Sequence, residues 1–229
     1  MSYGPPLFLS LTLGAYATGV VLQRLGRQHP LLNPTLLAIS AVASTLVLFR
    51  INYGTYFSAV QPIHLLLGPA VVALAVPLFR HLPLLRDRAP LLGIALFLGS
   101  LTAIASGIGA GCWFGLSQSM VLSLAPKSAT TAVSMAIAAQ IGGIPAVTAV
   151  LTVLTGISGA LIGGYVLKVM RIDDPAARGF GMGLTSHGIA TARAFQESEI
   201  AGTFSGLAMA LNAVVTAFLA PFLVPLLIH

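Results

Sequence analysis

The sequence is short of charge. Only 7% of its 229 residues are charged, with five acidic residues against eleven basic ones. An ordinary soluble domain carries about 25% charged residues, so a soluble fold of this size could not cover its surface. Apolar residues make up 57% of the chain. A bilayer, where apolar surface needs no covering, is the solvent that this composition favours.

Cysteine and several functional motifs are also scarce or missing. Cys112 is the only cysteine, which excludes an intramolecular disulfide and a cysteine-based metal site. The sequence has no G-x-x-x-x-G-K-[ST] loop of an ATPase and no His/Glu metal signature. The net charge of +6 is spread over short gaps between apolar runs, unlike the basic face of a nucleic-acid binder. We therefore expect no metal, no resident cofactor and no nucleic-acid partner.

Long apolar runs predict an all-α fold, a polytopic transmembrane helical bundle. A membrane-spanning helix needs roughly 20 mostly apolar residues. On this basis about seven spans are expected. One of them, residues 179–200, is Gly-rich and more polar than the others. The expected spans are 7–22, 31–49, 63–79, 91–111, 144–169, 179–200 and 204–228. Residues 112–143 predict an additional helix pair, either re-entrant or crossing twice. We expect residues 1–229 to form a single transmembrane domain.

Basic residues predict the orientation. They gather in three loops, which hold Arg24 and Arg27, then Arg80, Arg86 and Arg88, then Lys168, Arg171 and Arg178. Such loops face the cytoplasm. This places the N-terminus outside and the C-terminus inside, and it requires residues 112–143 to start and finish on the outer side.

A loose internal match is compatible with an inverted repeat. Gly68-Pro69 lines up with His187-Gly188, and Asn33-Pro34 lines up with Ala125-Pro126, which suggests halves of about 1–90 and 91–229. In transporters, helices interrupted by glycine or proline at corresponding positions of two halves mark the substrate site. The predicted helix breaks are Asn33, Pro34, Gly68, Pro69 and Pro126.

The first polar interruption covers residues 125–134. Pro126 disfavours helix at the preceding residue and suits the first position of a new helix. A helix start with free N–H groups, a lysine and hydroxyls suits a carboxylate ligand. The predicted ligands are Lys127, Ser128, Thr130 and Thr131. The alternative is a proline kink, in which the hydroxyls bond their own helix and the lysine reaches an interface.

The second interruption covers residues 181–193. Its composition fits two helical pieces joined at Ser186-His187-Gly188, with Thr191 close by. Gly188 permits an unwound backbone, whose carbonyls could hold a coupling Na⁺ while the next helix start holds an anion. His187 titrates near neutral pH when unperturbed and is the candidate proton carrier. The alternative is that His187 bonds a neighbouring helix.

Two charged residues follow this interruption. Arg193 and Glu197 are four residues apart and can pair on one helix face. Arg193 is also an alternative clamp for a substrate carboxylate, because guanidinium binds carboxylates through two hydrogen bonds. Ser186 and His187 lack a positioned third group, so we expect no enzyme.

Several runs resemble the LrgB/CidB family; they are Pro126–Thr131, Gln140–Ala146, Ile172–Gly179 and Ser186–Ala194, together with Leu66–Ala70. The resemblance covers nearly the whole chain, although Ala132 stands where the family favours proline. It implies an antiholin-like protein of the bacterial inner membrane with an LrgA/CidA-like partner in murein hydrolase and lysis control. It also implies a likeness to the plant plastid glycolate/glycerate transporter and to proteins of pyruvate handling.

We therefore expect a secondary transporter of small 2-hydroxy or 2-oxo monocarboxylates, such as glycolate, glycerate, lactate or pyruvate. Its expected partners are the carboxylate and the bilayer, and a homo-oligomer is compatible with the sequence. The alternative is an antiholin-like regulatory membrane protein without transport activity.

Overall fold

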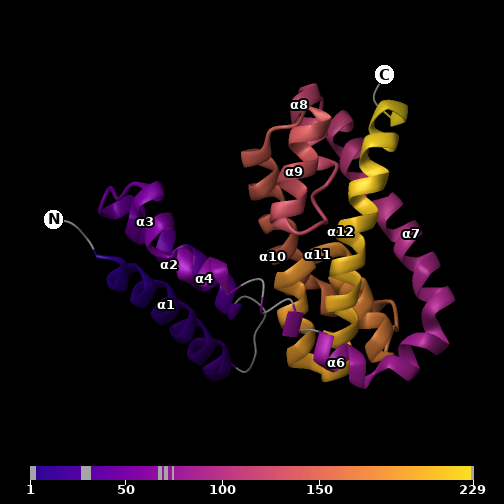
Figure 1. Cartoon of the computed structure of the whole chain (residues 1–229), viewed down its shortest axis with the longest axis horizontal. Helices are drawn as coiled ribbons and strands as arrows, with labels where there is room; N and C mark the ends of the chain where they lie inside the picture. The colour runs from indigo at the N-terminus through magenta and orange to yellow at the C-terminus, as the bar shows by residue number, and fades with distance from the viewer. Residues whose placement is uncertain (1–3, 27–31, 67–68, 70–71, 74, 228–229) are drawn as a thin grey trace. The chain divides into compact units, whose positions relative to one another are not determined.

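The described part of the chain is helical throughout. The computed structural model describes residues 4–26, 32–66, 69, 72–73 and 75–227, and these residues form helices and turns without a strand (Figure 1). Among them, four helices are long and apolar enough to cross a membrane; they are α1 (Pro5–Leu25), α7 (Leu82–Trp113), α10 (Pro145–Val169) and α12 (Glu199–Leu227). The predicted polytopic helical bundle is confirmed.

Two compact units divide the chain, residues 1–76 and 77–229. In the first unit, α1 packs on α2 (Pro34–Leu48), followed by α3 (Tyr53–Ala59) and α4 (Gln61–Leu65). A groove of about 530 Å³ runs between α1 and α2. The single domain and the repeat halves expected from the sequence stay predictions.

The predicted break at Asn33-Pro34 is a helix start. The Asn33 side-chain oxygen accepts hydrogen bonds from the N–H groups of Thr35 and Leu36 at 3.0 and 3.2 Å, and Pro34 takes the first helical position. Asn33 therefore lies at the boundary where α2 begins, and no helix interruption follows it within α2. Gly68 lies outside the described residues, and Pro69 stands between undescribed neighbours, so these two breaks stay predictions.

In the second unit, three long helices cross from one end to the other. After α6 (Ala75–Arg80) come α7, α10 and α12, whose 32, 25 and 29 residues correspond to lengths of about 48, 38 and 44 Å. Each exceeds the roughly 30 Å of a bilayer core. The helices α8 (Gln118–Leu124) and α9 (Thr131–Ile141) lie between α7 and α10 in the chain, and α11 (Pro175–Glu197) lies between α10 and α12.

Residues 118–141 form the first hairpin, which enters along α7 and returns by α9. Gly111 faces Val121 and Gly107 faces Leu124, so α8 runs inward, antiparallel to α7. The chain then turns, and α9 ends at Gly142, whose positive φ of 87° suits glycine. Residues 142–143 lie against Leu122 and the backbone of Ser123, so the chain returns toward the end where it entered. With only 11 residues in α9, or about 16 Å, this hairpin is re-entrant.

The second hairpin is α11 itself, which reverses at Ser186 and His187. These residues have non-helical backbone angles, with φ of −136° and +42°. They separate an arm at 175–185 from an arm at 188–197. Arg178 and Glu197 form an ion pair at 3.1 Å, whereas 19 residues of straight helix would hold them about 28 Å apart. The two arms therefore lie side by side and open toward the same end of the unit.

This reversal determines at which end of the unit α12 starts and at which end it finishes. Residues 179–200 do not cross, so α12 starts at the end of the unit where Arg80 pairs with Glu199. It finishes at the opposite end, where Ala220 and Val224 pack against α7 and α8 (Figure 1). The C-terminal end of α12 thus lies away from the basic loops at 80–88 and 168–178. The predicted span over residues 179–200 is wrong, because this segment is a hairpin. The orientation of the chain in the membrane stays a prediction.

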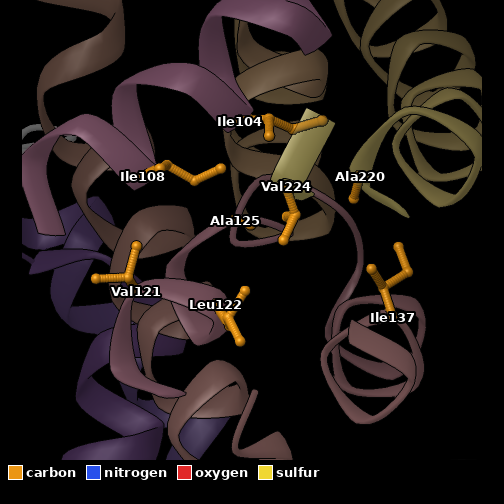
Figure 2. Packing of buried hydrophobic residues seen from close by; sticks show 8 residues of the cluster. All are labelled: Ile104, Ile108, Val121, Leu122, Ala125, Ile137, Ala220 and Val224. Atoms are coloured by element: carbon orange, nitrogen blue, oxygen red, sulfur yellow. The ribbon is translucent and has the colours of Figure 1, made fainter. Parts of the chain in front are cut away.

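Two apolar clusters hold the hairpins in place. Figure 2 shows the cluster beside the first hairpin, in which side chains of α7, α8, α9 and α12 meet; its buried members are Ile104, Ile108, Val121, Leu122, Ala125, Ile137, Ala220 and Val224. A second cluster packs the first arm of α11 against α7 and α12, through Leu96, Phe180, Leu184 and Phe204 among others. Both hairpins are therefore integral parts of the bundle.

Candidate functional site

The tips of the two hairpins meet at one side chain of α12. The amide nitrogen of Asn212 donates hydrogen bonds to the carbonyl oxygen of Ser128 at 2.9 Å and to that of Leu184 at 3.0 Å. Ser128 lies in the tip of the first hairpin, residues 125–130. Leu184 lies near the end of the first arm of the second hairpin, just before its tip. The two interruptions predicted from sequence are therefore brought together in the interior of the second unit.

Asn212 is fully buried and fully hydrogen-bonded. Its exposed fraction is 0%, and its side-chain oxygen accepts hydrogen bonds from Ser100 at 2.7 Å and Thr216 at 3.2 Å. An asparagine side chain has two N–H donors and one oxygen with two acceptor sites. All of these are used, so one side chain links α7, both hairpins and α12.

The first tip is a turn tied down by Ser134. The Ser134 hydroxyl contacts the carbonyl oxygens of Pro126 at 2.7 Å and Ala129 at 3.1 Å. The predicted helix start at Pro126 is wrong, since α9 begins only at Thr131 and Pro126 lies in the turn that Ser134 holds. Thr130 is the N-cap of α9, and its side chain makes no capping hydrogen bond.

Lys127 points toward α7. Its ammonium group donates to the carbonyl oxygen of Ala103 at 3.4 Å, and its side chain lies close to Gly107. Lys127 and Ser128 are neighbours in the tip, but only the backbone of Ser128 reaches Asn212. The charge lies beside the meeting point of the tips, on the side of α7.

At the second tip, His187 is buried and bonded to α10. Its Nε2 donates to the carbonyl oxygen of Thr152 at 2.9 Å, because a carbonyl can only accept. Its ring packs against Gly156, and Ser186 packs against Gly159. The residue with positive φ is His187 itself, so the unwound position predicted at Gly188 lies one residue earlier. The bond to a neighbouring helix, the alternative kept for His187, is present.

Thr191 joins the second arm of α11 to both its own tip and α12. Its hydroxyl donates to the carbonyl oxygen of His187 at 2.8 Å and lies 2.8 Å from the Ser205 hydroxyl. Arg193 is further along the arm, where it donates to the side chain of Gln196 at 3.0 Å. The predicted pair of Arg193 with Glu197 is wrong, because Glu197 pairs with Arg178 across the base of the hairpin.

The arrangement offers donors to a small anion. The helix α9 and the second arm of α11 both begin at the tips, and the first N–H groups of a helix have no partner inside it. The N-terminal positive ends of two half-helices thus follow the two tips that Asn212 joins. Within the described ranges, no group of three His, Cys, Asp or Glu side chains could hold a metal ion.

Sequence reasoning gave too little weight to the polar residues of the long helices. No site role was predicted for Asn212, Ser100, Thr152, Ser205 or Thr216. All five are buried. A usable signal was present, since Thr148, Thr152 and Gly156 recur at the four-residue spacing of one helix face in an otherwise apolar run.

At the end of the unit where the second hairpin opens, charged side chains pair. Arg88 bonds the Asp174 carboxylate, which also accepts from the N–H of Ala177 and so caps α11. This Arg88 hydrogen bond holds the pKa of Asp174 below its ordinary value, against a smaller opposing effect of burial. Arg80 and His81 lie near Glu199 at 3.5 and 3.9 Å. These pairs mark this end as the polar boundary of the bundle.

Comparison with known proteins identifies relatives over almost the full length. The chain is 36% identical to the uncharacterized protein YwbG of Bacillus subtilis over 203 residues, which is 89% of each chain. It is 34% identical to YxaC of the same bacterium, over 95% of this chain and 94% of that one. The holin-like protein CidB of Staphylococcus aureus is 29% identical over 86% of both. No solved structure matches.

The LrgB-like family matches residues 12–226, which include both hairpins and all the long helices except their ends. Apolar spans and bacterial relatives together describe a multi-pass integral membrane protein. On this match and on relatives above 30% identity, the chain belongs to the LrgB-like family.

Proposed function

We propose that the protein is a secondary transporter of small 2-hydroxy or 2-oxo monocarboxylates, of the glycolate, glycerate, lactate or pyruvate class. The observation that carries the proposal is the meeting of two re-entrant tips at Asn212. Non-helical backbone at membrane depth is tolerated where it is buried in protein or lines a cavity, and broken helices of this kind form substrate sites in transporters.

The direction of the hairpins supports the same function. The first enters from the end where α7 finishes, and the second enters from the end where α12 starts. Movement of one hairpin would expose the tips to one side of the membrane while the other stays closed. We place the basic loops in the cytoplasm of a bacterial inner membrane, so the C-terminal end of α12 faces outside.

The proposed anion site contains the two helix starts with the tip residues of both hairpins. Lys127 supplies positive charge at the α7 side of the site. The residues proposed to surround the two helix starts are Ser128, Thr130, Thr131, Ser186, Gly188 and Thr191. Arg193 lies outside this site, near the base of the second arm. A proton carried by His187 or a Na⁺ ion is the proposed coupling ion. We propose no enzymatic activity.

Uptake by liposomes containing the purified protein tests the proposal. We expect labelled glycolate or pyruvate to accumulate when a proton or sodium gradient is imposed. Lys127→Ala should lower uptake at least about tenfold, because a charge-assisted contact to a carboxylate is worth roughly 1.5–3 kcal/mol. Lys168→Ala is the matched control, since Lys168 lies in the exposed last turn of α10. Folded protein that transports none of these acids would overturn the proposal.

A second function is favoured by the relative named holin-like protein CidB. In that case the chain would regulate a small LrgA/CidA-like membrane partner. This function predicts a stable complex with the partner on co-purification and no response of either protein to carboxylates. A carboxylate-induced rise in melting temperature of the isolated chain would argue against it.

A further inference from the structure

The hydroxyl of Thr152 in α10 is buried without a partner. Thr152 is 0% exposed, and no described residue hydrogen-bonds its Oγ1. Its neighbours on the helix behave differently, because the Thr148 hydroxyl bonds the carbonyl of Ser123 and the Thr155 hydroxyl bonds that of Leu151. An unpaired buried hydroxyl destabilises a fold, so it calls for a physical explanation. A ligand that binds the hydroxyl is one such explanation.

The position of Thr152 on α10 is between the two hairpins. One turn earlier, the Thr148 hydroxyl donates to the carbonyl oxygen of Ser123 in the first hairpin at 3.0 Å. One turn later, Gly156 lies against the ring of His187 at the second tip. Thr148, Thr152 and Gly156 share one helix face, so the free hydroxyl lies on the face of α10 that contacts both hairpins.

Both half-helix starts lie at the same depth as Thr152. His187, which precedes the second arm of α11, bonds the Thr152 carbonyl directly at 2.9 Å. The helix α9 packs on α10 after the reversal at 142–144, and its 11 residues extend back about 16 Å. That length brings Thr131 to the level of residues 152–155 of α10.

From this convergence we propose that Thr152 is a substrate-binding residue, whose hydroxyl donates to an oxygen of the bound small carboxylate. The proposal rests on the transport function above. Because Asn212 joins the tips, the anion reaches Thr152 only when they separate. The hydroxyl then completes a donor set made of the N–H groups at the starts of α9 and of the second arm of α11. His187 contributes by holding the Thr152 backbone.

Thr152→Val tests the role of the hydroxyl at nearly constant shape. The probes are sodium glycolate and sodium pyruvate, with sodium chloride as the blank, and the measurement is the melting temperature of the full chain in detergent. Without ligand, the variant should melt at the same temperature as the parent or above it, since an unpaired polar group has been removed. Its apparent affinity for the carboxylates should fall about 10- to 100-fold, which is the loss of one hydrogen bond to a charged group.

Thr155→Val is the matched control, because it removes a hydroxyl that bonds only its own helix one turn away. It should keep the affinity of the parent, and Thr152→Ser, which retains a hydroxyl, should keep most of it. If Thr152→Val does not fold, Thr152→Ala replaces it in the same comparison. Equal affinity of the parent and the folded hydroxyl-free variant would overturn the role of Thr152 alone. A parent that responds to neither acid, and transports neither, would overturn the transport function as well.

Discussion

The two hairpins are attached to the rest of their unit in different ways. The first arm of α11 packs against α12 backbone to backbone, where Gly179 meets the carbonyl of Ala201 and Gly183 meets that of Ser205. Toward α12, the first hairpin has the Asn212 bond to the carbonyl of Ser128 and contacts between apolar side chains. Its close backbone approach is to α7 instead, where Gly107 meets the carbonyl of Leu124.

The difference indicates which hairpin moves more easily. Contacts between backbones leave no room for side chains to adjust, whereas apolar side chains can slide and change rotamer. The ion pair between Arg178 and Glu197 also ties the arms of the second hairpin together at their base. We therefore expect the second hairpin to move with α12 as one body and the first hairpin to separate from it.

The largest effect is expected from Gly183→Ala. The new Cβ atom would overlap the carbonyl oxygen of Ser205, and two packed backbones cannot yield without moving apart. We expect a loss of about 3 kcal/mol or more in stability, measured as a lower melting temperature in detergent. Gly181→Ala is the control, because its Cβ would have only one neighbour, at 4.0 Å. Equal melting temperatures of the two variants would contradict a rigid contact between α11 and α12.

An intermediate effect is expected from Asn212→Ala. The variant leaves the carbonyls of Ser128 and Leu184 and the hydroxyl of Ser100 without their buried partner, at a cost of roughly 2–4 kcal/mol. Hydrogen exchange should speed up more in residues 126–134 than in residues 180–188, because glycine contacts still hold the second hairpin. Thr216→Val removes one bond only and should change both regions little. If exchange sped up mainly in residues 180–188, the second hairpin would be the more easily displaced of the two, contrary to the expectation.

The smallest effect is expected at the base of the second hairpin, and it depends on pH. The pKa of Asp174 is lowered in the folded protein by its bond to Arg88, so the ionised carboxylate stabilises the fold. This stabilisation is fully present above the unfolded pKa of about 4 and is lost as the pH falls through the lower folded value. Asp174→Asn keeps an N-cap but removes the charge. Its melting temperature should fall less than that of the parent between neutral pH and about pH 3. An identical pH profile for both proteins would show that the pair contributes nothing.

The sequence was sufficient for the class of fold and for the two interruptions. Apolar runs long enough to cross a bilayer and a charge content of 7% permit few alternatives to a helical membrane bundle. The stretches around Pro126 and His187 also stood out, because polar residues interrupt apolar runs there. Apolar runs and their polar interruptions are local features of the sequence, so hydropathy and periodicity detect them.

The path of the chain through the interruptions was not readable from sequence. A broken helix that continues and one that reverses have the same composition, and the reversal at His187 depends on contacts with Thr152 and Gly156 in α10. Glycines at 179 and 183 permit the close approach to α12, but a glycine in a helix has no unique meaning without its neighbour. The partner of Glu197 was missed for the same reason, since pairing across the hairpin requires the reversal.

The shared amide of Asn212 has an electrical consequence. Each hairpin covers only about half of the bilayer thickness, by the length of its arms. In the proposed transport cycle, water would follow the first hairpin to the tips as it separates, and the second hairpin alone would insulate the two sides. The membrane voltage would then fall over that short barrier, where a unit charge gains or loses about 2.3 kcal/mol per 100 mV. Transport of a monoanion through this layer should therefore respond steeply to membrane potential, unless a coupled cation cancels its charge.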